Sequence, residues 1–371
     1  MRKNTTPGWI HVVDHAFALL VSCPLVSLLW WGGFSLTDRY IHQTEQPAGY
    51  CFSFVLGSLV LQNAHLVASD LAELTRRCPV TGQILERLAS ALLIVSVIFQ
   101  WDGLWSLLDF FMGETKVSCL ICWAIGTTVL VMAKVHNNVV SGVPYILRPD
   151  SSRSLFEFES RFLIQELQEN RLKSFMDHAF SVFVVQPAIV LIWRAAWNVQ
   201  DYCLFPSDPE FSANVSYLAG TFVTVLQFCL QNFMTNWMEK SSVFERHVIA
   251  FIWRQMAVCS SVTLWRGQWV WFSIWMDNIY ITSFVTLASA FVLLTLNLGT
   301  LSFQLGAVPD TALKSSADCM RFQIGYFSLI WQERSEYRPS KMAAKCSIES
   351  ESPTSLKDAP QQHVIYEMSG P

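Results

Sequence analysis

Ionisable residues inside apolar segments are the first candidates for chemistry in this sequence. Asp14-His15 opens one apolar segment and Asp177-His178 opens another, and Ala-Phe follows each pair. A carboxylate at membrane depth can serve an ion pathway, and a histidine can change its charge near pH 6.5. A carboxylate at a helix start also binds free backbone amides and complements the helix dipole. We expect both aspartates to cap the cytoplasmic starts of their helices, with the histidines beside them as pH-sensing candidates.

Arg254 is a charged residue within another apolar stretch. It lies eleven residues before Trp265, which is about 16 Å along a helix. An arginine at that depth has to face the bundle interior or water and find a partner, which makes Arg254 a pathway candidate. The alternative is a shorter helix in which Arg254 extends to the cytoplasmic interface and Arg266 becomes the buried charge.

Two prolines occupy matching positions in two apolar segments. Pro24 and Pro187 each lie ten residues past the aspartate of their segment, near the middle of a span. Proline removes a backbone hydrogen bond and kinks a helix. Matching kinks suit a central pathway, although membrane helices also tolerate proline without a functional reason.

The composition predicts an all-α protein that spans a membrane several times. The chain has 371 residues, 52% of them hydrophobic and only 15% charged, whereas soluble domains carry about 25% charged residues. Apolar runs near the twenty residues needed to cross a bilayer predict eight spans. The eight segments are 12–31, 49–68, 88–106, 117–135, 179–199, 215–234, 247–271 and 279–301.

The basic residues predict the orientation of these spans. With a cytoplasmic N-terminus, 21 of the 25 Lys and Arg fall on the cytoplasmic side. Only Arg39, Lys116, Arg194 and Arg266 fall on the outer side. Short cytoplasmic loops retain Lys and Arg, so this asymmetry predicts that both termini are cytoplasmic. The sequon that begins at Asn214 falls on a predicted outer loop, where a glycan can be added.

One motif occurs four times: Trp, any residue, a small residue, any residue and an aromatic. The copies are Trp30 to Phe34, Trp101 to Trp105, Trp193 to Trp197 and Trp265 to Trp269. Eight residues after the first Trp stand Asp38, Asp109, Asp201 and, in the fourth copy, Ser273. Each copy ends an odd-numbered span at the outer face. The unit is therefore a two-helix hairpin used four times, in two parallel halves.

Two interpretations of this motif are open. Tryptophan prefers the membrane interface, and a small residue allows close helix packing, so the motif is explained as an interfacial anchor. The functional alternative is an outer vestibule ringed by tryptophan together with Arg194, Arg266 and Asp102. Opposite charges at equivalent positions would then pair across the bundle.

The segments outside the two halves divide the chain further. Residues 1–135 form the first four-helix half and 177–305 the second. The cytoplasmic linker 136–176 contains an amphipathic stretch that suits the inner membrane surface or packing on the bundle. Residues 306–371 form a cytoplasmic tail, which is polar, serine-rich and expected to be largely disordered from about 335.

Several classes of function lack their residues here. The spans contain no series of carboxylates for a proton relay and no arginine ladder. Phosphate-binding glycine loops, zincin motifs and nucleophile elbows are also missing. The ten cysteines show no metal-ligand spacing. We therefore expect no enzyme, no catalytic residue, no cofactor, no metal and no nucleic-acid partner.

The paired Asp-His-Ala-Phe motifs at 14–17 and 177–180, with the Trp motifs at 193–197 and 265–269, resemble the fuseless family of invertebrate multipass proteins. The resemblance covers about residues 10–305. It implies eight spans, cytoplasmic termini and a presynaptic role in calcium-channel organisation and synaptic transmission, with no catalytic residues.

Two functions follow as predictions. The first is a non-enzymatic plasma-membrane protein that organises or supports a presynaptic membrane complex, with the bilayer and synaptic membrane or channel proteins as partners of its cytoplasmic segments. The alternative is a small-solute transporter or channel with a pathway between the two halves. A chemosensory receptor would instead have an odd number of spans and termini on opposite sides.

Overall fold

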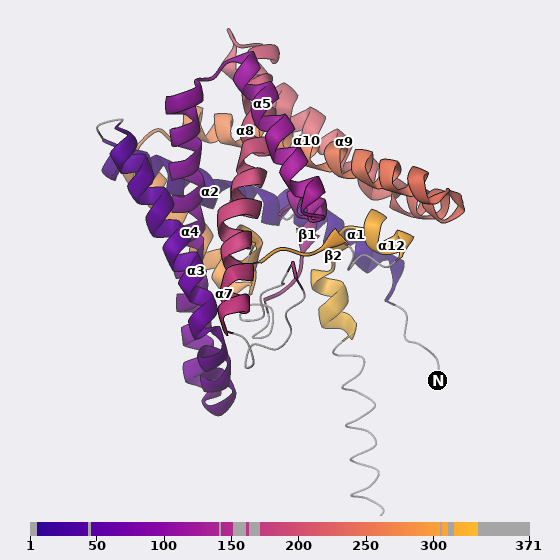
Figure 1. Ribbon diagram of the computed structural model, residues 1–371, viewed down its shortest axis with the longest axis horizontal. Coiled ribbons are helices and arrows are strands. Elements are labelled where there is room, and N and C mark those ends of the chain that lie inside the picture. Colours follow the sequence, from indigo (N-terminus) through magenta and orange to yellow (C-terminus); the bar gives the residue numbers. More distant parts are fainter. Residues whose placement is uncertain are drawn as a thin grey trace, which may run out of the picture.

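The computed structural model describes residues 6–43, 46–140, 142–150, 161–162, 171–304, 306–310 and 315–332. These residues form a bundle of long helices (Figure 1). The α-helices are α1 (Gly8–Phe17), α2 (Cys23–Tyr40), α3 (Pro47–Arg77), α4 (Pro79–Met112), α5 (Lys116–Met132), α7 (Arg171–Phe180), α8 (Gln186–Cys203), α9 (Pro209–Lys240), α10 (Val243–Trp275), α11 (Ile279–Thr295) and α12 (Ser316–Met320). Shorter elements are the π-helical turns η1 (Ala18–Ser22) and η3 (Ser181–Val185), the 3₁₀ helices η2 (His136–Val140) and η4 (Gly299–Ser302), and the parallel strands β1 (Ile146–Leu147) and β2 (Gln323–Ile324). A last helix covers 326–332.

Local sequence explains where the helices begin. Three of them start with proline at the first position, where its missing N–H is not needed. The side chains of Thr115 and Asn278 accept hydrogen bonds from the first turns of α5 and α11. Ser242 and Glu245 form a capping box at the start of α10.

The apolar segments of the sequence all fall on helices. Five stretches are long and apolar enough to cross a membrane: Gly8–Tyr40, Val80–Met112, Leu172–Cys203, Pro209–Lys240 and Val243–Trp275. Counted together, Pro47–Ala64 and Leu66–Thr75, which are bent by 40°, make a sixth. α5 and α11 are apolar but shorter. The all-helical, membrane-type fold is therefore confirmed, while the count of eight spans stays a prediction.

Four helices form a closed ring at the centre of the bundle. In the order α2, α4, α8 and α10, each contacts the next, and α10 returns to α2. We call these the inner helices. The four peripheral helices α3, α5, α9 and α11 pack outside them. Large apolar side chains on the peripheral helices are exposed, among them Leu120, Phe222 and Phe284, as expected of a surface that faces lipid.

The pairing of peripheral with inner helices differs from a simple hairpin. α3 packs on α4, α5 on α8 and α9 on α10, so each peripheral helix packs on the inner helix that follows it in the chain. α11 has no later helix of this kind and packs on α2. The main packing partner of each peripheral helix therefore carries the next motif copy, while the two-helix repeat unit stays a prediction.

Small residues set the spacing between these helix pairs. A Cβ added at Gly103 of α4 would lie 2.4 Å from the backbone nitrogen of Phe54 in α3. A Cβ at Gly267 of α10 would lie 2.5 Å from the backbone nitrogen of Tyr217 in α9. The third position of the motif is therefore a place where two backbones approach closely, as is typical of membrane helix pairs.

We expect Gly103→Ala to destabilise the protein by about 1–3 kcal/mol, because the added methyl group meets backbone and the helices have to separate. Gly8→Ala is the matched control, since nothing lies within 4 Å of its added Cβ. Thermal unfolding of the purified protein in a maltoside detergent measures both. Equal unfolding midpoints for the two variants would refute the close approach of α3 and α4.

A π-helical turn precedes each of the two matching prolines. The π-helical turn η1 ends one residue before Cys23-Pro24, and η3 ends one residue before Gln186-Pro187. Proline lacks the N–H that continues an α-helical hydrogen-bond ladder, and π-turns are a known cause of kinks. The inner helices α2 and α8 are therefore each preceded by an equivalent π-helical turn.

The segments that follow α5 and α11 cap each other. The Asp150 carboxylate accepts hydrogen bonds from the backbone N–H groups of Gly299 and Thr300, which start η4. The Asp310 carboxylate accepts from His136 and Asn137, which start η2. Since each aspartate satisfies free amides of the other half, these two linkers are tied together across the bundle.

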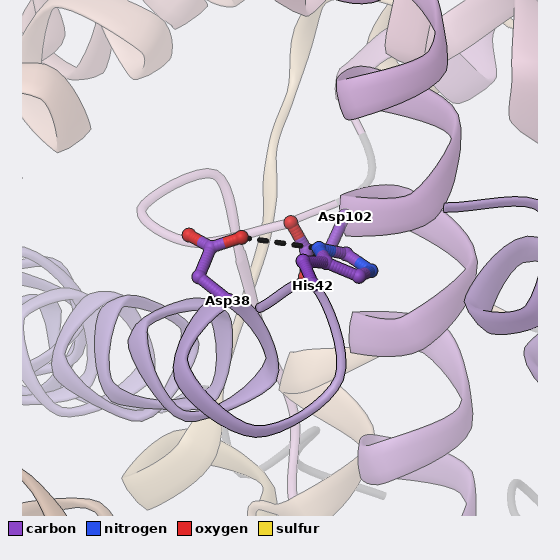
Figure 2. Close-up of side chains that lie close together, drawn as sticks. All are labelled: Asp38, His42 and Asp102. Atoms are coloured by element: carbon purple, nitrogen blue, oxygen red, sulfur yellow. Dashed lines mark hydrogen bonds and ion pairs between the residues drawn. The ribbon is translucent and has the colours of Figure 1, made fainter. Parts of the chain in front are cut away.

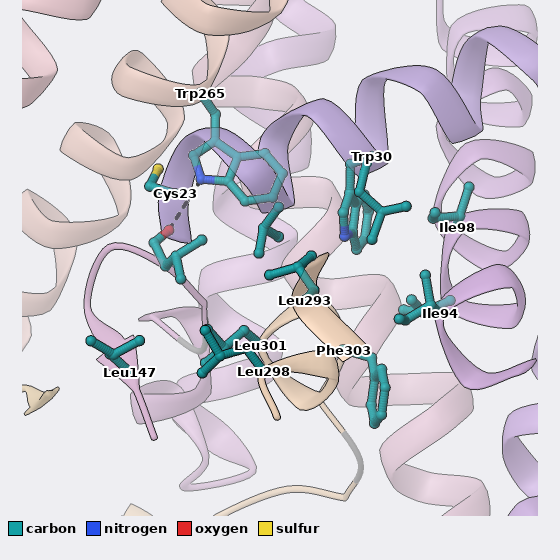
Figure 3. Packing of buried hydrophobic residues seen from close by; sticks show 14 of the residues in the cluster. Cys23, Trp30, Ile94, Ile98, Leu147, Trp265, Leu293, Leu298, Leu301 and Phe303 are labelled. Atoms are coloured by element: carbon teal, nitrogen blue, oxygen red, sulfur yellow. Dashed lines mark hydrogen bonds between the residues drawn. The ribbon is translucent and has the colours of Figure 1, made fainter. Parts of the chain in front are cut away.

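These linkers also fill the centre of the ring from one end. Trp30 donates its indole N–H to the carbonyl of Ser302 at 3.2 Å, and Trp265 donates to the carbonyl of Val143 at 3.1 Å. Figure 3 shows Leu298, Leu301 and Phe303 packed beneath the two tryptophans. We call this end the linker end and the opposite end the cavity end.

Candidate functional site

The first tryptophans of the four motif copies meet at the centre of the inner helices. The centroids of Trp30 and Trp101 are 5.1 Å apart, and those of Trp101 and Trp193 are 5.7 Å apart. The circle closes through Trp265, at 5.4 Å from Trp193 and 5.9 Å from Trp30. All four contacts are edge to face, the preferred geometry of aromatic pairs. We call these four residues the tryptophan ring.

A second layer of aromatics lies one helical turn toward the cavity end. It consists of Phe34, Trp105, Trp197 and Trp269, each four residues after a member of the ring and therefore on the same helix face. Trp197 contacts Trp105 at 5.9 Å and Trp269 at 5.5 Å, and Phe34 contacts Trp269 at 5.2 Å. Both layers line one cavity of about 430 Å³.

The tryptophans therefore do not form a belt at the membrane interface. The ring members are buried or half-buried against one another, and the cavity lies between the inner helices. The interfacial-anchor interpretation was wrong for these residues, and the vestibule interpretation is the one that the geometry supports. Asp102 lines the cavity as expected, but Arg194 and Arg266 do not.

The two motif arginines instead join neighbouring inner helices. Arg194 is fully buried and donates from Nε to Asp109 of α4 at 2.7 Å. Arg266 is buried as well and donates from Nε to Asp201 of α8 at 2.7 Å. Each arginine thus pairs with the aspartate that stands eight residues after the Trp of the preceding copy. The predicted pairing of opposite charges at equivalent positions was therefore wrong, because both arginines pair with the later aspartate of the neighbouring copy and not with Asp102.

The residue after the first Trp and the residue eight positions after it also meet at the other two interfaces of the ring. Trp31 donates its indole N–H to the hydroxyl of Ser273 at 3.0 Å, which joins the first copy to the fourth. Asp102 and Asp38 meet at the interface of α4 and α2, where His42 lies between them. Ser273, which breaks the aspartate series, is therefore matched by a partner that carries no charge.

His42 sits between the two carboxylates in Figure 2. Its Nδ1 lies 3.1 Å from Asp38 Oδ1 and 3.7 Å from Asp102 Oδ2, and its Nε2 lies 2.9 Å from the Ser53 hydroxyl. The side chains of His42 and Asp102 are buried, whereas that of Asp38 is 61% exposed. The buried Oδ2 of Asp102 has no hydrogen-bond partner. Among the described residues, Asp38, His42 and Asp102 form the group of side chains that could hold a metal ion.

Arg254 lies at the linker end. Its Nη1 is 3.8 Å from Asp310 Oδ1, the carboxylate that caps η2. Arg254 is buried and has a carboxylate partner, as expected of an arginine that faces the bundle interior, but it does not line the aromatic cavity. Arg266 is buried as well, so which of the two charges lies at membrane depth stays a prediction. The sequence alone did not give Asp310 as its partner.

His136 shares this cluster. It is buried, stacks on Phe251 and lies 2.8 Å from the amide nitrogen of Gln255 through its Nε2. Burial lowers the pKa of His136 from 6.5 to about 4; the charge of Arg254 lowers it further, while Asp310 opposes the change.

We predict that His136 makes stability depend on pH between about 6.5 and 4. Because its folded-state pKa lies below the unfolded value, its contribution is complete above pH 6.5 and is lost as the pH falls toward 4, by about 1.4 kcal/mol per pH unit. Thermal unfolding at pH 7.5 and pH 5 should therefore show a larger loss for the wild-type protein than for His136→Gln. Parallel losses in the two proteins would contradict the prediction.

The paired Asp-His motifs lie at the linker end, but not at helix starts. Asp14 is the seventh residue of α1 and Asp177 the seventh of α7. Asp14 is buried and accepts from the backbone N–H groups of Phe327 and Ser328, at the start of helix 326–332. Asp177 accepts from the backbone N–H of Phe162. Both aspartates therefore cap a distant segment, and the prediction that they cap their own helices was wrong.

The histidines of these motifs contact polar side chains or line a small void. His15 lies 3.3 Å from the amide nitrogen of Gln231 and packs edge to face on Phe228. His178 lines a small cavity together with Gln186 and Gln304. Pro24 and Pro187 follow the two π-helical turns and line neither of the two cavities described here.

The glycosylation candidate lies on a helix, and the cysteines of the described residues form no disulfide. Asn214 lies in the second turn of α9 and not in a loop, and Ser216 of its sequon is buried against Arg266. Glycosylation of Asn214 stays a prediction. The cysteines of the described residues are all free. The amphipathic stretch of the 136–176 linker lies mostly outside the described residues, and so does the tail beyond 332.

Comparison with known proteins places these features in a family. A family model described as Fuseless matches residues 9–302. No curated protein and no solved structure matches the chain. The matched range extends from α1 into η4, so it includes the four inner helices, the four peripheral helices and both layers of the aromatic cavity. Because the match covers most of the chain, this protein belongs to the Fuseless family.

Proposed function

We propose that this protein is a non-enzymatic plasma-membrane protein that organises or supports a presynaptic membrane complex. Its eight spans would leave both termini in the cytoplasm and arise from four two-helix units in two parallel halves. The family membership supports this role. The parallel direction of the four inner helices, which all end shortly after the aromatic layers, supports the fourfold origin.

The closed centre of the ring is the observation that carries a non-conducting role. The tryptophan ring blocks the axis, and the linkers after α5 and α11 pack directly beneath it. Within the described residues, the cavity of about 430 Å³ therefore lies on the side of the tryptophan ring away from these linkers. A blind cavity suits recognition of a ligand or partner, whereas conduction needs a continuous path.

Rescue of neurons that lack this protein tests the organising role. We expect the full chain to restore calcium-channel abundance at the presynaptic membrane and evoked release, and a deletion of residues 335–371 to fail although it reaches the cell surface. The matched control carries those residues in scrambled order and should also fail if their sequence binds a partner. Full rescue by the deletion would refute a partner site in that part of the tail.

Transport remains the second candidate because η1 and η3 lie at matching positions before Pro24 and Pro187. Such interruptions are places where helices bend during alternating access. Liposomes that contain the purified protein separate the two functions. Absence of solute uptake and of current supports the organising role, while uptake that is lost in Pro24→Ala/Pro187→Ala would overturn it.

A further inference from the structure

The aromatic cavity has the size and lining of a ligand site. Its volume of about 430 Å³ lies within the range of small-molecule pockets. Tryptophans from all four inner helices and Phe34 supply the walls, and hydroxyl groups of Ser35 and Ser106 contribute polar edges. Rigid indole rings that are already packed edge to face need little reordering when a ligand binds.

The ionisable residues of the lining are all acidic. The ionisable side chains in it are Asp38, Asp102 and Asp109, without a lysine or arginine. Asp109 is already paired with Arg194, which lies behind the cavity wall, and Asp38 is paired with His42. Asp102 is the remaining carboxylate, and the basic side chain beside it is His42, whose Nδ1 lies 3.7 Å from its Oδ2.

Asp102 provides a second, independent indication of a ligand. It is 2% exposed, and its Oδ2 makes no hydrogen bond. A buried carboxylate oxygen without a donor is unfavourable, so a donor or a positive charge from a ligand would stabilise it. The imidazole of His42 is poorly placed for this, because its Nδ1 is closer to Asp38 and its Nε2 bonds Ser53.

Aromatic faces and a carboxylate together recognise one chemical class. An ammonium group within about 6 Å of an indole face is attracted by its negative π cloud, and quaternary ammonium compounds are bound in this way. We propose that the aromatic cavity binds a small organic cation, an amine or quaternary ammonium group, with Asp102 as its counter-ion and the tryptophans as its walls. The site is independent of whether the protein organises a complex or transports a solute.

A bare metal ion is the competing occupant. Asp38, His42 and Asp102 each offer one ligand atom, and these atoms lie within 4.8 Å of one another. A metal ion needs only these three side chains, however, and leaves the eight aromatic rings and most of the cavity volume unexplained. The organic cation uses both features.

Choline and its neutral carbon analogue 3,3-dimethylbutan-1-ol provide a matched pair of probes, since they differ in charge but hardly in shape. The full-length protein is purified in a maltoside detergent without choline lipids or choline detergents. Calorimetric titration and tryptophan fluorescence measure binding. We expect choline to bind at least tenfold more tightly than the neutral analogue. Equal binding of the two, or no choline binding by folded protein, would overturn the proposal.

Variants identify the counter-ion. Asp102→Asn should weaken choline binding at least tenfold and leave binding of the neutral analogue unchanged. Asp70→Asn, at an exposed carboxylate outside the cavity, is the control and should bind as the wild type does. Unfolding midpoints above the assay temperature show that each variant is folded. Unaltered choline binding by Asp102→Asn would refute its role.

Two further titrations show whether the bound ammonium group comes from a lipid headgroup or a free amine, and whether a metal ion occupies the site instead. Short-chain phosphatidylcholine competing with free choline would extend the site to lipid headgroups, whereas binding of choline alone would restrict it to free amines; both results support the cation site. Binding of Zn²⁺ or Mn²⁺ that depends on Asp102, without any binding of choline, would replace the proposal with a metal site. These outcomes are measured on the isolated protein and do not depend on neuronal rescue.

Discussion

Arg194→Gln should lower the free energy of unfolding by about 3–5 kcal/mol, because it breaks a buried ion pair and leaves a carboxylate behind. The guanidinium is fully buried and uses all its nitrogens: Nε donates to Asp109, Nη1 to the Ser118 hydroxyl at 3.0 Å and Nη2 to the Gly113 carbonyl at 2.8 Å. A glutamine is too short to reach these three acceptors together. Thermal or denaturant unfolding of the purified protein measures the loss.

The control and the double variant make this prediction specific. Arg39→Gln removes an exposed arginine and should change stability by less than about 0.5 kcal/mol. Arg194→Gln/Asp109→Asn removes both charges and should be more stable than Arg194→Gln alone. If the single variant unfolds at the same midpoint as Arg39→Gln, the pairing of α8 with α4 through these residues is wrong.

Trp30→Ala should destabilise the protein by about 3–5 kcal/mol, the range for removing a large buried aromatic side chain. Trp30 is only 7% exposed, contacts Trp101 and Trp265, and holds the linker through Ser302. Its loss should also change the near-ultraviolet circular dichroism, which reports on packed indoles. Trp30→Phe keeps an aromatic ring but not the N–H, and its unfolding midpoint should lie between those of the wild type and Trp30→Ala.

Trp9→Ala is the matched control, since Trp9 is 63% exposed. It removes the same side chain from a surface position and should leave both the unfolding midpoint and the dichroism nearly unchanged. Equal effects of Trp9→Ala and Trp30→Ala would contradict the presence of a packed tryptophan ring.

The sequence predicts the helices of this fold well because each apolar run has to become a helix in lipid. The repeated spacing of Trp30, Trp101, Trp193 and Trp265 also pointed to equivalent positions. It did not tell which way these residues face, since lipid and a tryptophan-lined centre both accept apolar side chains. Interfacial placement and an aromatic vestibule were therefore both compatible with the sequence.

The contacts that the sequence missed join residues far apart in the chain. Asp109 and Asp201 were visible as members of a series, but their partners became clear only once the order of the inner helices was known. No sequence pattern marked Asp150 and Asp310 as caps, because each binds the start of a helix far away in the chain: Asp150 binds η4 and Asp310 binds η2. Asp14 was misplaced because α1 begins at Gly8, six residues before it.

His42 had a local signal in the sequence that pointed to Asp38 alone. It stands four residues after Asp38, a helical spacing that brings the two side chains together. Asp102 completes the cluster from another helix, and this contact follows from the closed ring. The candidate cation site is thus a consequence of the ring and not of any single motif.

The closure of the ring between the first and last motif copies is the central claim, and one cross-linking measurement tests it. A Cβ at Gly32 of α2 would lie 3.0 Å from the Cβ of Thr286 in α11. This is about 0.5 Å below the usual range in a disulfide, so a small separation of the two helices allows the bond. A protease site in the loop 204–208 separates the two positions into different fragments. Oxidation of the Gly32→Cys/Thr286→Cys variant in native membranes should keep the cleaved fragments together until reductant is added. Gly32→Cys/Phe284→Cys, with the second cysteine on the exposed side of α11, should release them. Release of the fragments in both variants would contradict the packing of α11 on α2, which brings the last helix pair back to the first inner helix, and so would contradict closure between the first and last copies.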